Sequence, residues 1–365
     1  MEKKIAIVTM WDTQDNYGQV LQCYALQRFF IDQGCYSFLI KTKSDTQALA
    51  SLSKRLQSLP AKVLSLDFWD LLYFRYKQKK FFKCYGYINR RFDEFRSLYI
   101  KSTGKIYDIN ELIKECPEAD IYITGSDQVW GAISDLYFLN FVPKGKKRFS
   151  YAASFGKNSF SKSDLKRMSQ YLKTFDMVTV RESVGVYKCK LMGVIAERVI
   201  DPTGLLTDKD YIDMASLPDE KGYILLYLLG NYTDVHVGSI FKYAERMHMT
   251  IKYVASQGRN DHYPKIFPSP TEWLGLIANA GYVITNSYHC CLFSVYFKKP
   301  FWALRLTRIF KNMNSRMDTL YSIYKLPQVE SITELVTTSF NYNVISRLLE
   351  QDRNEAVEIL KTWIK

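Results

Sequence analysis

The 365-residue chain lacks several patterns that would place it in a common protein class. It has no run of about 18 apolar residues, so no membrane-spanning helix is expected. It contains neither the G-x-G-x-x-G fingerprint of dinucleotide-binding folds nor the G-x4-G-K-[ST] loop that cradles phosphates. A dinucleotide-dependent dehydrogenase and a P-loop enzyme are therefore not expected.

Cysteine and histidine are scarce, with seven and four residues. The cysteines are odd in number and show no regular spacing, and the start MEKKIAIVTM lacks the pattern of a secretory signal. We therefore expect a reducing, cytoplasmic location. Zinc sites usually use pairs spaced C-x2-4-C or H-x3-5-H, whereas the adjacent His289, Cys290 and Cys291 point in different directions. No metal site is expected.

The net charge of +13 fits an anionic substrate, a nucleic acid or an acidic membrane surface. The signatures of the common nucleic-acid modules are absent, so a nucleic-acid partner is not expected. Residues 67–101 mix aromatic side chains with Lys and Arg and have a helical pattern. Two interpretations stay open. The favoured one is a helical insertion that packs its aromatics on the domain; the other is a helix lying on an anionic bilayer, at the inner face of the membrane.

Strand and helix patterns alternate along most of the chain. Apolar runs predict strands at Lys4–Met10, Cys35–Ile40, Ala119–Thr124, 147–154, Asp176–Val180, Gly222–Leu229, Thr250–Ser256, Gly281–Thr285 and 299–306. Helical spacing predicts helices at Gln19–Gln33, Ser163–Thr174, Val235–Met247, 271–280 with Thr271 as a cap, from near Tyr288, and Tyr342–Trp363. Such alternation is typical of parallel, doubly wound sheets.

The pattern restarts after Asp201-Pro202-Thr203, which predicts an α/β fold with two Rossmann-like domains facing across a cleft. The first domain covers residues 1–195, with a helical insertion at about 45–115, and is predicted to face the acceptor. The second covers 196–340. The helix at 341–365 is predicted to cross back onto the first domain.

Polar, glycine-containing turns follow the predicted strands, where ligands bind in such folds. One of them is ITNSYHCC, which places His289 in the first turn of a helix capped by Asn286 or Ser287. Helix starts attract anions, and a catalytic and a structural histidine are equally open here. Asp208-Lys209-Asp210 resembles the D-x-D of metal-dependent glycosyltransferases, but a helix start that offsets the dipole is favoured.

Six motifs in order resemble the polysaccharide pyruvyl transferase family. They are DNYGQVLQCYALQ, ADIYITGSDQVW, YAASFG with TVRES, VIDPT, ITNSYHCCLFSVYFKKPF, and Asn314-Ser315-Arg316. The resemblance runs from the first strand to about Met317. It departs at Cys290 and Cys291, where the family usually has small residues such as Gly-Thr or Gly-Ala.

The resemblance implies a fold like the GT-B glycosyltransferases. It also implies transfer of the pyruvate moiety of phosphoenolpyruvate onto two hydroxyls of a sugar in a capsular polysaccharide or exopolysaccharide, or in its lipid-linked precursor. The product is a ketal, phosphate is released, and no cofactor is needed. The residues it assigns are His289 as general acid; Asp127 as base or helix cap; Arg181, Asn286, Ser287 and Arg316 for phosphoenolpyruvate; and Asn16, Tyr17, Gln19, Ser126 and Trp130 for the acceptor. Two alternatives stay open: a GT-B glycosyltransferase that uses a nucleotide sugar, and a non-catalytic glycan-binding protein.

Overall fold

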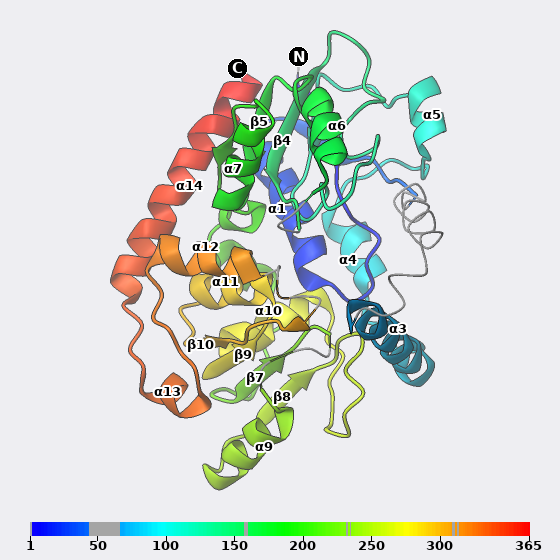
Figure 1. Cartoon of the computed structure of the whole chain (residues 1–365). Coiled ribbons are helices and arrows are strands. Elements are labelled where there is room, and N and C mark those ends of the chain that lie inside the picture. The colour runs from blue at the N-terminus through cyan, green and yellow to red at the C-terminus, as the bar shows by residue number, and fades with distance from the viewer. Residues whose placement is uncertain are drawn as a thin grey trace.

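A computed structural model describes residues 2–43, 66–156, 160–230, 233, 235–308, 311 and 314–365. Within this part of the chain, two parallel β-sheets form the centres of two domains (Figure 1). The helical insertion predicted at about 45–115 is described from residue 66 onward, and residues 45–65 lie outside the described residues.

The first sheet has the strand order β2-β1-β3-β4-β5-β6, and all neighbouring strands are parallel. Its strands are β1 (Lys4–Val8), β2 (Tyr36–Leu39), β3 (Ile121–Thr124), β4 (Lys147–Ala153), β5 (Met177–Val180) and β6 (Glu197–Arg198). β3 is buried along its full length, as expected for a parallel strand covered on both faces. Because β6 pairs with β5, the first sheet continues past the predicted boundary at residue 195.

The second sheet has the order β10-β9-β7-β8 and is also parallel. Its strands are β7 (Ile224–Tyr227), β8 (Ile251–Val254), β9 (Tyr282–Thr285) and β10 (Phe301–Ala303). The remaining elements are α1 (Tyr17–Asp32), α3 (Leu66–Tyr85), α4 (Phe92–Tyr99), α5 (Ile109–Lys114), α6 (Lys162–Leu172), α7 (Ser183–Leu191), η1 (Pro202–Gly204), α8 (Asp208–Met214), α9 (Val237–Arg246), α10 (Pro270–Asn279), α11 (Tyr288–Tyr296), α12 (Ser315–Tyr324), α13 (Ile332–Thr337) and α14 (Tyr342–Ile364).

Two helix starts of the second domain are set by serine caps. The cap of α10 is Ser269 and not the predicted Thr271, because Ser269 and Glu272 form a reciprocal capping box. α11 begins after Ser287, whose side chain accepts a hydrogen bond from the backbone N–H of Cys290. The cap fixes the first turn of α11 directly after β9, at the edge of the sheet that faces the other domain.

The two domains share one continuous apolar core. Tyr17, at the start of α1, stacks on Trp273 of α10 with ring centroids 4.9 Å apart. The Tyr17 hydroxyl also donates a hydrogen bond to the carbonyl of Pro268 at 2.7 Å. Since Trp273 and Pro268 belong to the second domain, these contacts hold the start of α1 against it.

α14 returns from the second domain and runs along the first, toward the N-terminus (Figure 1). Trp363 stacks on Phe149 of β4 with centroids 4.3 Å apart. Asp352 accepts a hydrogen bond from Arg198 of β6 at 3.0 Å. These contacts tie the end of the chain to the first sheet.

α3 belongs to the helical insertion and packs against the second domain. Tyr85 packs on Phe267 with centroids 5.2 Å apart, and Asn260 donates a hydrogen bond to the carbonyl of Lys77 at 2.8 Å. None of the helices in the described part of the chain is long and apolar enough to cross a bilayer.

Candidate functional site

A cavity of about 180 Å³ lies between the domains, beyond the carboxyl ends of β3 and β9. Six of the predicted site residues line it: Asn16, Asp127, Asn286, Ser287, His289 and Arg316. The other lining residues are Phe74, Gln128, Leu229, Gly230, Tyr288 and Leu306. The cavity therefore joins side chains from the end of β3, the start of α1, α3, and the starts of α11 and α12.

His289 is held from both domains. It lies in the first turn of α11, where it is 6% exposed, and its Nε2 is 3.4 Å from Oδ2 of Asp201. Gly18 of α1 packs on the imidazole so closely that an added Cβ would lie 2.1 Å from its Cγ. Glycine at this position thus permits the close approach of α1 to the ring. The arrangement fixes the ring between a carboxylate and a helix backbone.

Asp201 is the centre of this cluster, although its sequence indicates only a domain break and the VIDPT motif and no site role. One of its oxygens accepts from the backbone N–H of Thr203 at 3.0 Å, and the other from Nη1 of Arg181 at 2.9 Å. Burial alone would raise the pKa of Asp201, but the adjacent His289 and Arg181 outweigh burial and hold it well below its ordinary value. A buried, ionised carboxylate beside an imidazole can orient the ring and stabilise its protonated form.

Arg181 does not line the cavity. Its side chain is 1% exposed, and besides Asp201 it contacts Glu182 through Nε at 3.2 Å. Burial would lower the pKa of Arg181, but Glu182 and Asp201 outweigh burial and raise it. Two of its nitrogens are committed to Asp201 and Glu182, and through Asp201 it positions His289. Its Nη2 has no hydrogen-bond partner, so the predicted direct contact of Arg181 with phosphoenolpyruvate stays a prediction.

Arg316 is the cation that reaches the cavity. Within the described residues, its guanidinium makes neither a hydrogen bond nor an ion pair. Its Cζ lies 5.9 Å from the centre of the Tyr288 ring, and Cζ of Arg181 lies 4.7 Å from the same ring. Burial and the nearby Arg181 lower the pKa of Arg316. A bound anion would offset both effects, so this side chain is suited to hold one.

Asp127 and Asn16, the cap of α1, belong to the first-domain wall. Asp127 has a positive φ of 67° and lines the cavity. It accepts a hydrogen bond from Nε2 of Gln19 at 3.3 Å. Asn16 caps α1 by accepting from the Gln19 backbone N–H at 3.2 Å. Asn16 lines the cavity, and Gln19 lies behind Asp127.

Asn286 and Ser287 shape the second-domain wall. The Asn286 side chain accepts from the backbone N–H of Leu229 at 2.6 Å and donates to the Leu229 carbonyl at 2.8 Å. Ser287 accepts from Cys290, which leaves its own hydroxyl hydrogen for a ligand. Asn286 thus positions the loop, whereas Ser287 can contact what binds there.

Three predicted acceptor contacts are corrected because their side chains belong to the core. Tyr17 is fully buried against Trp273. Trp130 stacks on Phe138 with centroids 5.6 Å apart and is likewise fully buried. Ser126 is also buried, and its hydroxyl donates to the carbonyl of Ala152 at 2.9 Å. None of the three lines the cavity.

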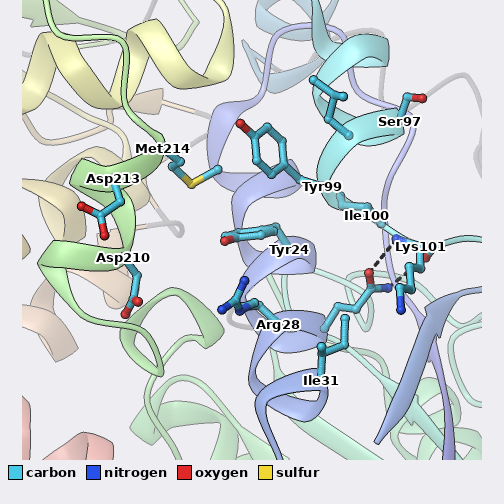
Figure 2. A pocket seen from close by; sticks show the side chains of 12 residues that line it. Tyr24, Arg28, Ile31, Ser97, Tyr99, Ile100, Lys101, Asp210, Asp213 and Met214 are labelled. Carbon is cyan, nitrogen blue, oxygen red and sulfur yellow. Dashed lines mark hydrogen bonds between the residues drawn. The ribbon is translucent and has the colours of Figure 1, made fainter. Parts of the chain in front are cut away.

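The D-x-D sequence lies elsewhere, beside a groove of about 500 Å³ between α1, α4 and α8 (Figure 2). Asp210 and Asp213 stand on α8 across from Tyr24 and Arg28 of α1. Asp210 forms a capping box with Thr207, which supports the interpretation as a helix start. Within the described residues, no three His, Cys, Asp or Glu side chains are grouped to hold a metal ion.

Comparison with solved structures places the fold. The UDP-GlcNAc 2-epimerase from Neisseria meningitidis, bound to UDP-GlcNAc, superposes with a TM-score of 0.54 and 12% identity over 98% of each chain. The enzyme of the same name from Methanocaldococcus jannaschii, in complex with UDP-GlcNAc and UDP, gives 0.53 and 13% over 99% of each chain. At these identities the similarity concerns the fold alone, and it confirms the GT-B-like arrangement of two Rossmann-like domains.

A comparison with curated proteins gives no match. A family profile, in contrast, matches residues 16–307, and its description is "Polysaccharide pyruvyl transferase". The matched range begins at Asn16, before α1, and includes β9, α11 and the His289–Asp201 pair. The chain belongs to the polysaccharide pyruvyl transferase family.

Proposed function

We propose that the chain moves the pyruvate moiety of phosphoenolpyruvate onto two hydroxyls of a sugar in a cell-surface polysaccharide or its lipid-linked precursor. A ketal forms and phosphate leaves. One observation carries the proposal: a compact cavity combines the His289–Asp201 pair with Arg316, whose guanidinium has no hydrogen-bond or ion-pair partner in the described part of the chain. Such a set can bind a small anion and give it a proton.

The donor binds at the second-domain wall. Phosphoenolpyruvate is a compact, multiply charged anion. The free N–H groups at the start of α11, the Ser287 hydroxyl and the Arg316 guanidinium hold its phosphate and carboxylate. Arg181 acts at one remove, because it holds Asp201 in place.

The reaction adds one proton to the methylene carbon of phosphoenolpyruvate and removes one proton from each of two sugar hydroxyls. His289 donates a proton to the methylene carbon, so the neighbouring carbon becomes electrophilic and one sugar hydroxyl adds to it. The C–O bond to phosphate breaks, and the second hydroxyl closes the ketal. On the opposite wall Asp127 accepts the proton of one hydroxyl, and His289 regains its proton from the other. Asn16 contacts the sugar, and Gln19 holds Asp127 from behind. The net extra proton leaves with phosphate.

Arg316→Ala is expected to weaken phosphoenolpyruvate binding by about 1.5–3 kcal/mol, the usual worth of a hydrogen bond to a charged group. Arg316→Lys should recover only part of the loss, since lysine lacks the planar fork. Titration calorimetry measures both, with the exposed Arg167→Ala as control. Unchanged affinity in Arg316→Ala would remove this residue from the donor site.

The two alternatives differ in their ligands. A nucleotide-sugar glycosyltransferase should be protected against heat by UDP or GDP, and a glycan-binding protein should bind saccharide without releasing phosphate. The proposal expects thermal protection by phosphoenolpyruvate. Protection by a nucleotide alone would favour the glycosyltransferase.

We also propose that α3 rests on the cytoplasmic face of an anionic membrane. Its outer face carries Trp69 and Tyr76, which are 58% and 60% exposed, with Leu72 and Tyr73 between them at helical spacing. Lysines 79, 80 and 83 follow on the same face and are exposed. The favoured interpretation that the aromatics pack on the domain holds for Phe81 but not for this outer face.

The Trp69→Ser, Tyr76→Ser double variant should bind vesicles of phosphatidylcholine with phosphatidylglycerol about tenfold more weakly, because two aromatic side chains no longer enter the interface. Tyr187→Ser is the matched control, since Tyr187 is 60% exposed on α7. Flotation of protein with vesicles measures the effect. Equal flotation of all three proteins would contradict the membrane contact.

A further inference from the structure

A second cavity of about 610 Å³ shares two wall segments with the first, although no residue lines both. In α3, Phe74 lines the first cavity and Tyr73 the second; after β10, Leu306 lines the first and Thr307 the second. The walls of the second cavity come from α3, the start of α9, the loop after β8, and the segment after β10.

Arg259 is an unsatisfied buried cation in this wall. It is 6% exposed, its Nε and Nη2 have no hydrogen-bond partner, and no carboxylate of the described residues forms an ion pair with it. Burial lowers the pKa of Arg259. Burying a guanidinium with two unpaired nitrogens costs free energy, because its hydrogen bonds to water are lost and no protein acceptor replaces them. An anionic ligand would supply the missing acceptors.

The start of α9 faces the same cavity. Its cap, His236, makes no side-chain capping bond, so the first N–H groups of the helix stay open for a ligand. Val237 and Gly238 both line the cavity. A Cβ added at Gly238 would lie 2.8 Å from the hydroxyl of Tyr263, so glycine keeps the backbone close to this wall. The helix dipole adds attraction for negative charge.

The remaining charges of the cavity are mostly positive. Lys77 of α3 lies on the rim, over the Tyr73 ring at 5.2 Å. Arg308 pairs with Asp70 at 2.8 Å. Among the described residues, Asp261 is the one acid that lines the cavity, and Lys265 offsets it with its Nζ 2.7 Å away.

We propose that this cavity binds the diphosphate group of a ligand. The donors stand on separate elements, Arg259 on the loop after β8 and the free N–H groups on α9, so they suit two linked phosphates better than one. The cavity is also larger than the first. Resting on the proposed function, the ligand is a saccharide acceptor with a diphosphate at one end, and its sugar extends past the shared wall segments toward His289.

Titration calorimetry with inorganic pyrophosphate tests the site. Arg259→Gln should weaken pyrophosphate binding roughly 10- to 100-fold, the effect of losing charged hydrogen bonds, and leave phosphoenolpyruvate binding unchanged. Thermal unfolding confirms that the variant folds. Arg246→Gln, at the exposed far end of α9, is the matched control and should bind like the wild type. Equal pyrophosphate affinity in folded Arg259→Gln would overturn the proposal.

Two further ligands identify the source of the diphosphate. Farnesyl diphosphate and UDP are titrated under the same conditions, with inorganic phosphate as a third probe. Tighter binding of farnesyl diphosphate supports a lipid-linked acceptor, and tighter binding of UDP supports a nucleotide-linked one. If inorganic phosphate binds with the same affinity as pyrophosphate, the diphosphate assignment is overturned. If pyrophosphate binds but no ketal product forms with any acceptor, the proposed function is wrong, whereas the diphosphate site is supported.

Discussion

His289→Gln is expected to lower turnover by roughly 10²–10⁴-fold, the usual contribution of a positioned proton donor. Glutamine keeps the size and hydrogen-bonding character of the side chain but carries no acidic proton. The ring lies in the cavity with its Nε2 3.4 Å from Asp201, so its removal acts on the chemical step and not on the fold. Turnover at saturating phosphoenolpyruvate and acceptor measures the loss.

His248→Asn is the control for this experiment. His248 is exposed beyond the end of α9, and its backbone has a positive φ of 53° that asparagine tolerates. This variant should keep wild-type turnover. Near-normal turnover in folded His289→Gln would remove His289 from the chemistry.

A substitution at Gly18, in the first domain, should also displace His289. In Gly18→Ala the new Cβ would occupy space 2.1 Å from Cγ of His289, so the ring or α1 must shift. A displacement of about 1 Å can cost 10²-fold in rate, and turnover should fall by about that factor. Wild-type turnover in this variant would show that the ring position tolerates movement that our account forbids.

Asp201→Ala should have the largest effect on stability. The substitution leaves the buried Arg181 without its closest carboxylate, and breaking a buried pair typically costs about 3–5 kcal/mol. Urea unfolding of wild type and variant measures the difference. Asp32→Ala is the control, because Asp32 pairs with Arg28 on the surface and should matter by less than about 1 kcal/mol.

The contribution of Asp201 should also depend on pH. Because its pKa is lowered in the folded protein, its stabilisation is complete above the unfolded value of about 3.9 and is lost as the pH falls toward the folded value. The stability difference between wild type and Asp201→Asn should therefore shrink as the pH falls below about 4. A difference that grows on acidification would contradict the ionised carboxylate.

Much of the fold follows from pattern alone. The apolar runs are the strands, since a parallel strand buried on both faces must be apolar throughout. The turns after β3 and β9 meet at the cleft because parallel strands end on one edge. That rule brings Asp127 and His289 to one cavity, and their placement could be predicted from the sequence.

The partners of each side chain could not be predicted in the same way. Periodicity shows where a strand ends but not whether the next side chain turns into the core, so Tyr17 and Trp130 were predicted to contact the acceptor. Asp201 has the sequence of a turn before proline, and only the fold places it beside His289 and Arg181. Which arginine reaches the ligand depends on that pairing.

The second cavity has no sequence signature. Its lining comes from separate parts of the chain: Arg259 lies on the loop after β8, Val237 begins α9, and Lys77 belongs to the insertion. No spacing rule connects these positions, because their proximity arises from packing of α3 against the second domain.

The most direct test of the account is incubation of the protein with phosphoenolpyruvate and a panel of free and lipid-linked saccharides, followed by mass spectrometry. We predict a saccharide that gains one pyruvate ketal, one phosphate released for each ketal, and neither product with His289→Gln. Phosphate release without ketal, or a glycosyl group transferred from a nucleotide sugar in place of pyruvate, would contradict it.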